Sequence, residues 1–475
     1  MKRISLLILA LVATTTLWAV EMRSLSGYVL CDGEGVADVV VTDGENFTTT
    51  DSEGCYMLRS SSDNRLIYIT IPSGYRVASK QSVPQFWHPI TEGRTEYDFE
   101  LIRKTEDDTH HGFVAIADPQ IWHPKEFPAL SNGMADIHKT VESYSIPFHG
   151  ICCGDVTSYD HSIYARYNEI AATTGLDFFS TPGNHDMTLY GRSHETSMRL
   201  WEQTFGPACY SFNVGKAHYV VLNDNFYIGR DYFYIGYLDE KQYAWLERDL
   251  SYVPAGSTVF VVLHIPTTCE EKDRRQFTYG SIANVMTNAR PLYAMLEPYN
   301  AHILSGHTHT TYNQIISDRL YEHVVPALSG AWWQGPLCTD GTPRGYAVFE
   351  VNGGEVSWYY KSTDYAPDHQ MVLYYGEKYP HFTGQIVANV WAADPSWRVE
   401  VRFDGGAAVK MERFECYDPA AQEMYKSTEG FDHSYIYPSS ADHFYRVVVP
   451  DGAKKAVVEA EDRFGRVYTQ TLTLK

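Results

Sequence analysis

Six short apolar runs between residues 113 and 309 each end in polar residues, and this repetition constrains the fold more than any other feature of the sequence. The runs are FVAIADPQ, GICCGDV, DFFSTPGNHD, YVVLNDN, VFVVLHIP and AHILSGHTH. Helix-like stretches such as YARYNEIAATTG and LDEKQYAWLERDL lie between several of them. Buried strands that alternate with helices indicate an α/β domain, whose functional groups gather in loops at the strand ends.

Strand-like segments of another kind flank this region. Residues 22–103 alternate apolar and polar positions between Asp/Gly turns, which predicts a small all-β module. This stretch resembles the carboxypeptidase-regulatory-like β-sandwich, which implies a sandwich fold for it. Past Asp364, strand-like segments such as QIVANVW, RVEVRF and KAVVEAED return. A chain of 475 residues is long enough for several domains. We therefore predict an N-terminal β-sandwich module over 22–103, an α/β domain over 110–364 and a C-terminal β-rich domain over 365–475.

The first twenty residues have the pattern of a targeting segment. Lys2 and Arg3 precede an apolar run, and Ala19 is a small residue suited to a cleavage site. This pattern predicts a cleaved signal peptide over residues 1–20 and a secreted or periplasmic protein. The run is too short to span a membrane, and no later stretch is long and apolar enough, so we expect no stable membrane insertion. A net charge of -21 disfavours nucleic acid as a partner, because phosphate backbones are repelled.

The eight cysteines show no CxxC pair and no zinc-finger spacing. In an oxidising compartment Cys31 and Cys55 could pair, and the sequence leaves open whether they do. Cys152 and Cys153 lie in an apolar run and are expected to be buried thiols.

Five of the six polar clusters, with YVVLNDN left aside, supply a set of residues that could bind divalent metals. They supply Asp118, Gln120, Asp155, Asn184, His185, Asp186, His264, His307 and His309. Carboxylate, amide oxygen and imidazole are the ligands that Mn, Fe and Zn ions accept. Each cluster alone has an ordinary interpretation as a turn, a loop or a core histidine. Their joint occurrence after five predicted strands instead predicts a metal site.

The order of these clusters resembles that of the calcineurin-like metallophosphoesterases. The family blocks Asp-x-His, Gly-Asp, Gly-Asn-His-Asp/Glu, a single His and Gly-His-x-His correspond to Asp118-Pro119-Gln120, Gly154-Asp155, Gly183-Asn184-His185-Asp186, His264 and Gly306-His307-Thr308-His309. The resemblance covers roughly residues 110–364. It implies a β-sandwich flanked by helices (αββα) for the central domain. The flanking β regions resemble the accessory domains of bacterial secreted members.

The resemblance also implies roles for individual residues. The first metal would be held by Asp118, Gln120, Asp155 and His309. The second would be held by Asn184, His264 and His307, with Asp155 as the bridge. His185 would face the substrate phosphate as a catalytic residue and would not bind metal. Gln120 departs from the family, where many members have His, and its harder amide oxygen favours Mn or Fe over Zn.

These roles imply a phosphoester hydrolase in which two divalent metal ions (Mn, Fe or Zn) orient water for attack on phosphorus. His185 could protonate the leaving oxygen, with either Asp186 or Asp160 orienting its imidazole. A non-catalytic glycan- or protein-binding module is the alternative, but a decayed site would be expected to lose several ligands. The resemblance does not choose between a phosphomonoesterase, such as a nucleotidase, and a diesterase.

Two tryptophans, Trp332 and Trp333, follow the last ligand block by about two dozen residues. They could form an aromatic wall for the leaving group of a substrate. Packing against the C-terminal β region is the other interpretation and the preferred one. We expect the substrate to be a small extracytoplasmic phosphoester, for which a ring-shaped leaving group would suit the tryptophan pair.

Overall fold

The computed structural model of the chain describes residues 22–230, 233–268, 279–376 and 379–474. These residues form two compact units, one up to residue 69 together with 87–100, and a larger one of 70–86 and 101 onward. The predicted signal peptide over residues 1–20 lies outside the described residues. Among the helices of the described part, none has the length and apolar character that a membrane crossing requires.

The smaller unit consists of short antiparallel strands. β1 (Met22–Cys31) pairs with β2 (Glu34–Gly35) and with β5 (Cys55–Ser61). A second sheet has the order β10-β6-β3-β4, formed by Trp87–Pro89, Leu66–Ile69, Val40–Thr42 and Phe47–Thr49. Leu25 and Val29 of β1 are fully buried while their sequence neighbours are more exposed, as expected for a strand with one face on a core. The all-β character agrees with the sequence pattern, and Cys31 and Cys55 are both free thiols.

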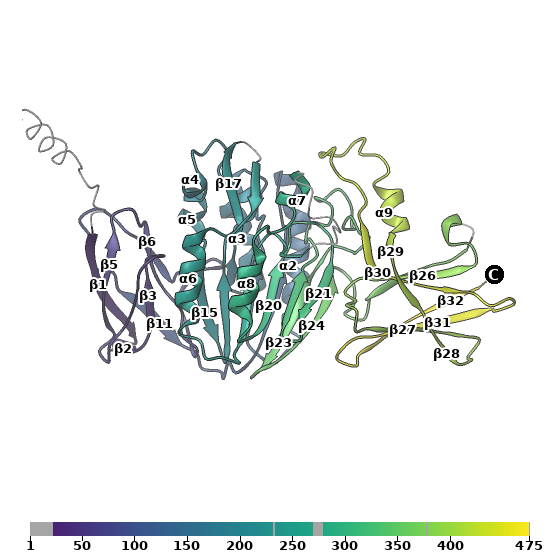
Figure 1. Cartoon of the computed structure of the whole chain (residues 1–475), viewed down its shortest axis with the longest axis horizontal. Coiled ribbons are helices and arrows are strands. Elements are labelled where there is room, and N and C mark those ends of the chain that lie inside the picture. Colours follow the sequence, from purple (N-terminus) through teal and green to yellow (C-terminus); the bar gives the residue numbers. More distant parts are fainter. Residues whose placement is uncertain (1–21, 231–232, 269–278, 377–378, 475) are drawn as a thin grey trace, which may run out of the picture. The chain divides into compact units, whose positions relative to one another are not determined.

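Two mixed sheets form the centre of the larger unit (Figure 1). The first has the order β14-β13-β12-β23-β24, with bounds Phe178–Ser180, Phe148–Cys152, His110–Ile116, Gly345–Asn352 and Glu355–Ser362. The second has the order β15-β16-β19-β20-β22-β21, with bounds Tyr210–Val214, Ala217–Val221, Thr258–Val262, Asn300–Ser305, Leu320–Val324 and Tyr312–Ser317. Strands β12, β13 and β14 are parallel, as are β16, β19, β20 and β22.

The alternation of side chains along β12 places apolar residues on both faces of the first sheet. Phe113 points between the sheets, where its ring lies 5.0 Å from that of Phe260 on β19 and 5.7 Å from that of Tyr219 on β16. Val114 faces the other way, into a core shared with helices α2 (Phe127–Val141) and α3 (Tyr164–Ala171).

Helices also cover the second sheet. In Figure 1, α6 (Glu240–Leu250) and α8 (Ala289–Leu296) lie in front of the strands. Helices α3 and α6 fall within the two stretches that the sequence predicts to be helical. The predicted sandwich flanked by helices is therefore confirmed.

The C-terminal region adds two further four-stranded antiparallel sheets. One has the order β25-β26-β30-β29, with bounds Met371–Tyr374, Gln385–Val390, Ser440–Val448 and Glu412–Tyr417. The other has the order β28-β27-β31-β32, with bounds Ala408–Lys410, Arg398–Phe403, Lys455–Glu461 and Val467–Thr473. Residues of both sheets, such as Ile386 and Val458, share one core. The β-rich character agrees with the sequence pattern, and this region joins the central sheets in one compact unit.

Short elements complete the described chain. They are β7 (Tyr75–Arg76), β8 (Ser79–Lys80), β9 (Val83–Pro84), β11 (Phe99–Arg103), β17 (Asn225–Arg230), β18 (Phe233–Gly236), α4 (His194–Ser197), α5 (Arg199–Phe205), α7 (Tyr279–Ala283), α9 (Pro419–Met424), and the 3-10 helices η1 (Pro124–Glu126), η2 (His161–Ile163), η3 (Ala172–Thr174), η4 (Asn184–Asp186) and η5 (Pro380–Phe382).

Candidate metal centre

The carboxyl ends of strands from both central sheets meet at one cluster of polar side chains. Parallel strands end at the same edge of a sheet, so residues far apart in sequence become neighbours there. The predicted ligands follow β12 (Asp118, Gln120), β13 (Asp155), β14 (Asn184), β19 (His264) and β20 (His307, His309). All of them except His307 are buried, with at most 3% of each residue exposed. The structure thus brings together the seven residues that the sequence predicts to bind metal.

The backbone at this cluster is held in an unusual conformation. Five of the seven predicted ligands have positive φ angles, namely Asp118 (49°), Gln120 (37°), Asp155 (53°), His307 (70°) and His309 (51°). Residues other than glycine seldom adopt this left-handed region, and such strain gathers where a site must present side chains in one arrangement. The turns after the strands are therefore shaped to point these side chains inward.

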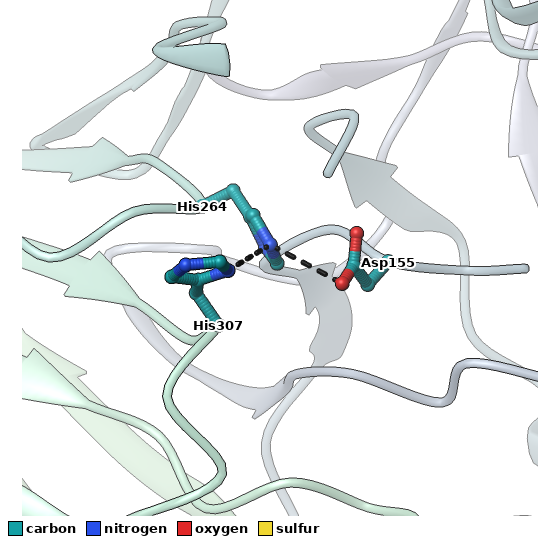
Figure 2. A group of neighbouring side chains, drawn as sticks. All are labelled: Asp155, His264 and His307. Atoms are coloured by element: carbon teal, nitrogen blue, oxygen red, sulfur yellow. Dashed lines mark hydrogen bonds and ion pairs between the residues drawn. The ribbon is translucent and has the colours of Figure 1, made fainter. Parts of the chain in front are cut away.

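One group of donor atoms surrounds His264. Its Nε2 lies 3.4 Å from Asp155 Oδ2, 3.1 Å from Asn184 Oδ1 and 3.2 Å from His307 Nδ1. Donor atoms of Asp155, His264 and His307 all lie within 4.8 Å of one another (Figure 2). This group contains the residues predicted to hold the second metal, and Figure 2 shows their side chains pointing toward a common centre.

A second group surrounds His309. Its Nε2 lies 2.8 Å from Gln120 Oε1 and 3.7 Å from Asp118 Oδ1. Asp118 also accepts hydrogen bonds from the backbone nitrogen of His307, at 2.9 and 3.2 Å from its two oxygens. These are the residues predicted for the first metal, apart from Asp155, whose bridging role stays a prediction.

The hydrogen bonds of the histidines favour a cation in both groups. His264 Nδ1 lies 2.7 Å from Cys153 O and His309 Nδ1 lies 2.6 Å from Gly330 O. A carbonyl oxygen only accepts, so each Nδ1 donates, and in the neutral ring each Nε2 presents a lone pair to the oxygens of its group. A lone pair that faces a carboxylate or amide oxygen at these distances is repelled unless a proton or a metal cation lies between the two atoms. Histidine that donates Nδ1–H to a carbonyl is a common arrangement in metal sites.

The charges of the cluster lead to the same conclusion. Burial raises the pKa of Asp118 to about 8 and lowers the pKa of His309 to about 4. Burial opposes a charge on His264 as well, but the adjacent Asp155 carboxylate outweighs it and raises the pKa of His264 to about 10. The cluster therefore retains protons in place of a cation, and a divalent ion would compete with the proton for His264 Nε2. The residues present thus fit a metal site.

His185 lies beside these groups without joining them. Its backbone nitrogen donates to Asp155 Oδ1 at 2.8 Å, and its ring packs against that of Tyr159 at 4.4 Å. Its Nδ1 is buried and makes no hydrogen bond within the described chain. This placement leaves the imidazole available to a ligand, and its catalytic role stays a prediction.

Within the described chain, neither Asp186 nor Asp160, the two carboxylates proposed to orient His185, makes a hydrogen bond to its Nδ1. Asp186 accepts hydrogen bonds from the backbone nitrogens of Val156 and Gly183 and holds the two ligand loops together. Asp160 accepts from Ser162, two residues along the chain. The ring contact on His185 comes instead from Tyr159, which the sequence analysis did not select.

Two buried carboxylates that the sequence analysis left out hold the loop of His264. Asp224 accepts hydrogen bonds from the backbone nitrogens of His264 and Ile265, at 3.1 Å each. Glu322 on β22 accepts from the backbone nitrogens of Thr267 and Thr268, at 2.6 and 2.9 Å. The signal for Asp224 was present in the sequence, because YVVLNDN is one of the six apolar runs that end in polar residues.

A cavity of about 750 Å³ opens over the predicted ligands. Gln120, Asp155, His185 and Trp332 are among the residues that line it. Trp332 stacks on the ring of His309 at 3.8 Å and also packs against Tyr435 of the C-terminal region at 5.2 Å.

Trp333 has a different position. Its indole nitrogen donates to Pro119 O at 2.9 Å, and it packs against the core that contains Val114 and α2. It is not among the residues lining the cavity described above. Trp332 therefore both lines the cavity and packs against the C-terminal region, whereas Trp333 packs. Contact of either residue with substrate stays a prediction.

Comparison with known proteins identifies matching families for three successive parts of the chain. The profile of the calcineurin-like phosphoesterases matches residues 108–311. Profiles for the N terminal and the C terminal of calcineurin-like phosphoesterase match residues 23–104 and 322–468. A comparison with curated protein sequences found no match.

Solved structures with a similar arrangement share little sequence with this chain. A dimetal phosphatase from Danio rerio is 14% identical, with a TM-score of 0.39 over 53% of this chain and 96% of its own. A purple acid phosphatase from yellow lupin (Lupinus luteus) is 12% identical, with a TM-score of 0.36 over 92% of this chain and 69% of its own. A 5'-nucleotidase from Candida albicans is 12% identical, with a TM-score of 0.32 over 55% of this chain and 53% of its own.

Proposed function

Because the chain belongs to the calcineurin-like phosphoesterase family and is a metal-dependent phosphoesterase, we propose that it hydrolyses a small phosphoester outside the cytoplasm with two adjacent divalent ions. The observation that carries the proposal is the pair of donor groups around His264 and His309. Each places an imidazole Nε2 at 2.8 to 3.4 Å from carboxylate or amide oxygens. Gln120, Asp155, His307 and His309 also line the same cavity, so one phosphoryl group could reach both groups.

Different residues of the site have different roles in the proposed hydrolysis. Asp118, Gln120, Asp155 and His309 would hold one ion, and Asp155, Asn184, His264 and His307 would hold the other. When bound, the ions neutralise charge on the phosphoryl oxygens and acidify water. In the reaction, a P–O bond forms to water and the ester P–O bond breaks, so the leaving oxygen requires a proton.

His185 is placed to supply that proton. Its backbone hydrogen bond to Asp155 ties its position to the ligand group, and its packing against Tyr159 restrains the ring. The imidazole thus acts as the general acid toward the leaving oxygen. Asp186 keeps the loops of Asp155 and His185 in register through its hydrogen bonds to Val156 and Gly183.

The basic and apolar N-terminal segment supports the extracytoplasmic location. The cavity of about 750 Å³ and the acidic chain support the preference for small substrates. The test of location is the mass and N-terminal sequence of protein expressed from the full gene. A mature protein that begins near residue 20 and is recovered outside the cytoplasm supports the proposal. Uncleaved protein that stays in the cytoplasm contradicts it.

The test of function uses metal-stripped full-length protein reconstituted separately with Mn, Fe, Zn and Ca. Each preparation is assayed against phosphomonoesters and phosphodiesters, and its metal content is measured. Two equivalents of metal with hydrolysis of at least one ester class support the proposal. Less than one equivalent contradicts the two-ion site. Full metal content without hydrolysis of any ester would favour the non-catalytic binding module.

A further inference from the structure

The cavity over the metal donors has an outer wall that comes from the C-terminal β region. Glu415 and Tyr417 of β29 line it together with Ser440, the first residue of β30, and Ser439, which precedes that strand. At about 750 Å³ the cavity has the size of a small-molecule site and is much larger than a phosphoryl group needs. The space beyond the metal donors is therefore available to the rest of a substrate.

Backbone hydrogen bonds fix this wall relative to the metal donors. The nitrogen of Ser439 donates to Thr339 O at 2.9 Å, and the hydroxyls of the two residues lie 3.0 Å apart. The nitrogen of Thr339 in turn donates to His309 O at 3.0 Å. A single residue, Thr339, thus connects the C-terminal wall to a predicted metal ligand.

A buried polar network strengthens the same connection. His443 of β30, which is fully buried, lies 2.8 Å from Asn389 Oδ1 through Nδ1 and 3.4 Å from Asp340 Oδ2 through Nε2. Asp340 Oδ2 also accepts from the backbone nitrogen of Thr311, two residues past His309, at 2.6 Å. Buried hydrogen bonds of this kind hold their elements in one arrangement. The wall is thus rigid, as a surface that selects substrates must be.

The side chains of this wall are suited to binding hydroxyl groups of a ligand. Glu415 accepts a hydrogen bond from the Ser440 hydroxyl at 3.0 Å, which steadies its carboxylate. The ladder between β29 and β30 shifts register between Phe414 and Cys416, and such irregularities redirect a side chain. Tyr417, two residues further along β29, is 47% exposed and lines the same cavity. A carboxylate, hydroxyls and an aromatic face together match a polyhydroxylated ring.

We propose that Glu415, Tyr417 and Ser440 form a subsite for the leaving group, and that this group is a sugar or cyclitol ring. This inference rests on the proposed phosphoester hydrolysis and names its substrate class. The Glu415 carboxylate accepts hydrogen bonds from ring hydroxyls, and Tyr417 covers one face of the ring. These residues act on specificity and do not touch the reacting phosphorus.

The test compares full-length, metal-loaded variants on four esters: hexose phosphate, inositol monophosphate, phosphocholine and para-nitrophenyl phosphate. Glu415→Ala should lower kcat/KM for the two polyol esters by about 10- to 100-fold, the effect of losing hydrogen bonds to a charged acceptor. It should change kcat/KM for para-nitrophenyl phosphate by no more than about twofold. Glu415→Gln, which keeps an acceptor oxygen, should recover part of the loss. The matched control is Glu412→Ala, because Glu412 lies on the same strand and pairs with Arg446 at 2.9 Å outside the cavity.

Three other results would each contradict a different part of the proposal. A selective loss on phosphocholine, with Glu415→Gln no better than Glu415→Ala, would replace the polyol by a cationic leaving group. Equal losses on all four esters would show that Glu415 does not determine specificity. If the wild type, fully loaded with metal, hydrolyses none of them and no other phosphoester, the proposed function itself fails.

Discussion

Substitution of Gly183 by Ala tests how tightly the ligand loops are packed. A Cβ atom at this position would lie 2.0 Å from Asp155 Oδ1 and 2.2 Å from the backbone nitrogen of Asp155. The backbone of Gly183, with φ of −99° and ψ of −179°, is one that alanine adopts without strain. The added methyl group therefore acts through its contact with the predicted bridging ligand and not through the backbone of residue 183.

The size of the effect follows from these distances. Carbon atoms essentially never approach other atoms within 3.0 Å, so Asp155 or the loop must move by at least 3.0 − 2.0 = 1.0 Å. Rotation of the Asp155 side chain cannot relieve the clash, because its backbone nitrogen is also too close. A displacement of about 1 Å at reacting groups lowers the rate by about 100-fold. Overpacking of this kind costs about 1–3 kcal/mol of stability.

Gly183→Ala should accordingly remain folded and lose both metal affinity and turnover. Metal content, kcat with para-nitrophenyl phosphate and thermal unfolding are measured side by side. Gly354→Ala is the control, since a Cβ there meets no atom within 4 Å. Full metal content and wild-type kcat in Gly183→Ala would refute the inference that Asp155 must keep its place.

Four further predictions concern the site and its surroundings. Asp155→Ala should abolish turnover and release metal without unfolding the protein, as metal analysis and circular dichroism would show. His185→Ala should retain its metals and lose about 10²- to 10⁴-fold in rate, so loss of metal from this variant would contradict its role as a general acid. In metal-free protein, Asp118 and His264 have pKa values of about 8 and about 10, above their ordinary 3.8 and 6.5. The folded state therefore keeps protons that the unfolded chain has released, and its stability should fall as the pH rises from about 7 to about 9. Chemical unfolding should show this fall, and metal loading should reduce it. Trp333→Ala should lower the unfolding temperature and change the rates on small and large esters equally, because Trp333 packs and does not line the cavity.

Much of the fold and of the candidate site could be predicted from local sequence patterns. An apolar run indicates a buried strand, and a polar cluster directly after it indicates the end of that strand. Both patterns span only a few residues, so they can be recognised without the fold. Asp118, Asp155, His264 and His307 were identifiable in this way, and the folded chain brings them together as their order implied. The flanking β regions were recognisable for the same reason, from alternation and turn residues.

Contacts between distant segments required the folded chain. Asp224 holds His264 through a backbone nitrogen forty residues away, and a backbone acceptor or donor leaves no trace in residue type. The hydrogen bond that Asp186 accepts from the backbone nitrogen of Val156 depends on how two loops meet. Trp332 serves both the cavity and the C-terminal packing because its ring lies between His309 and Tyr435. Short-range periodicity indicates which residues are buried. Only the packing of remote segments determines which of them become neighbours. The contribution of Glu415 to the cavity wall could therefore be found only in the tertiary structure.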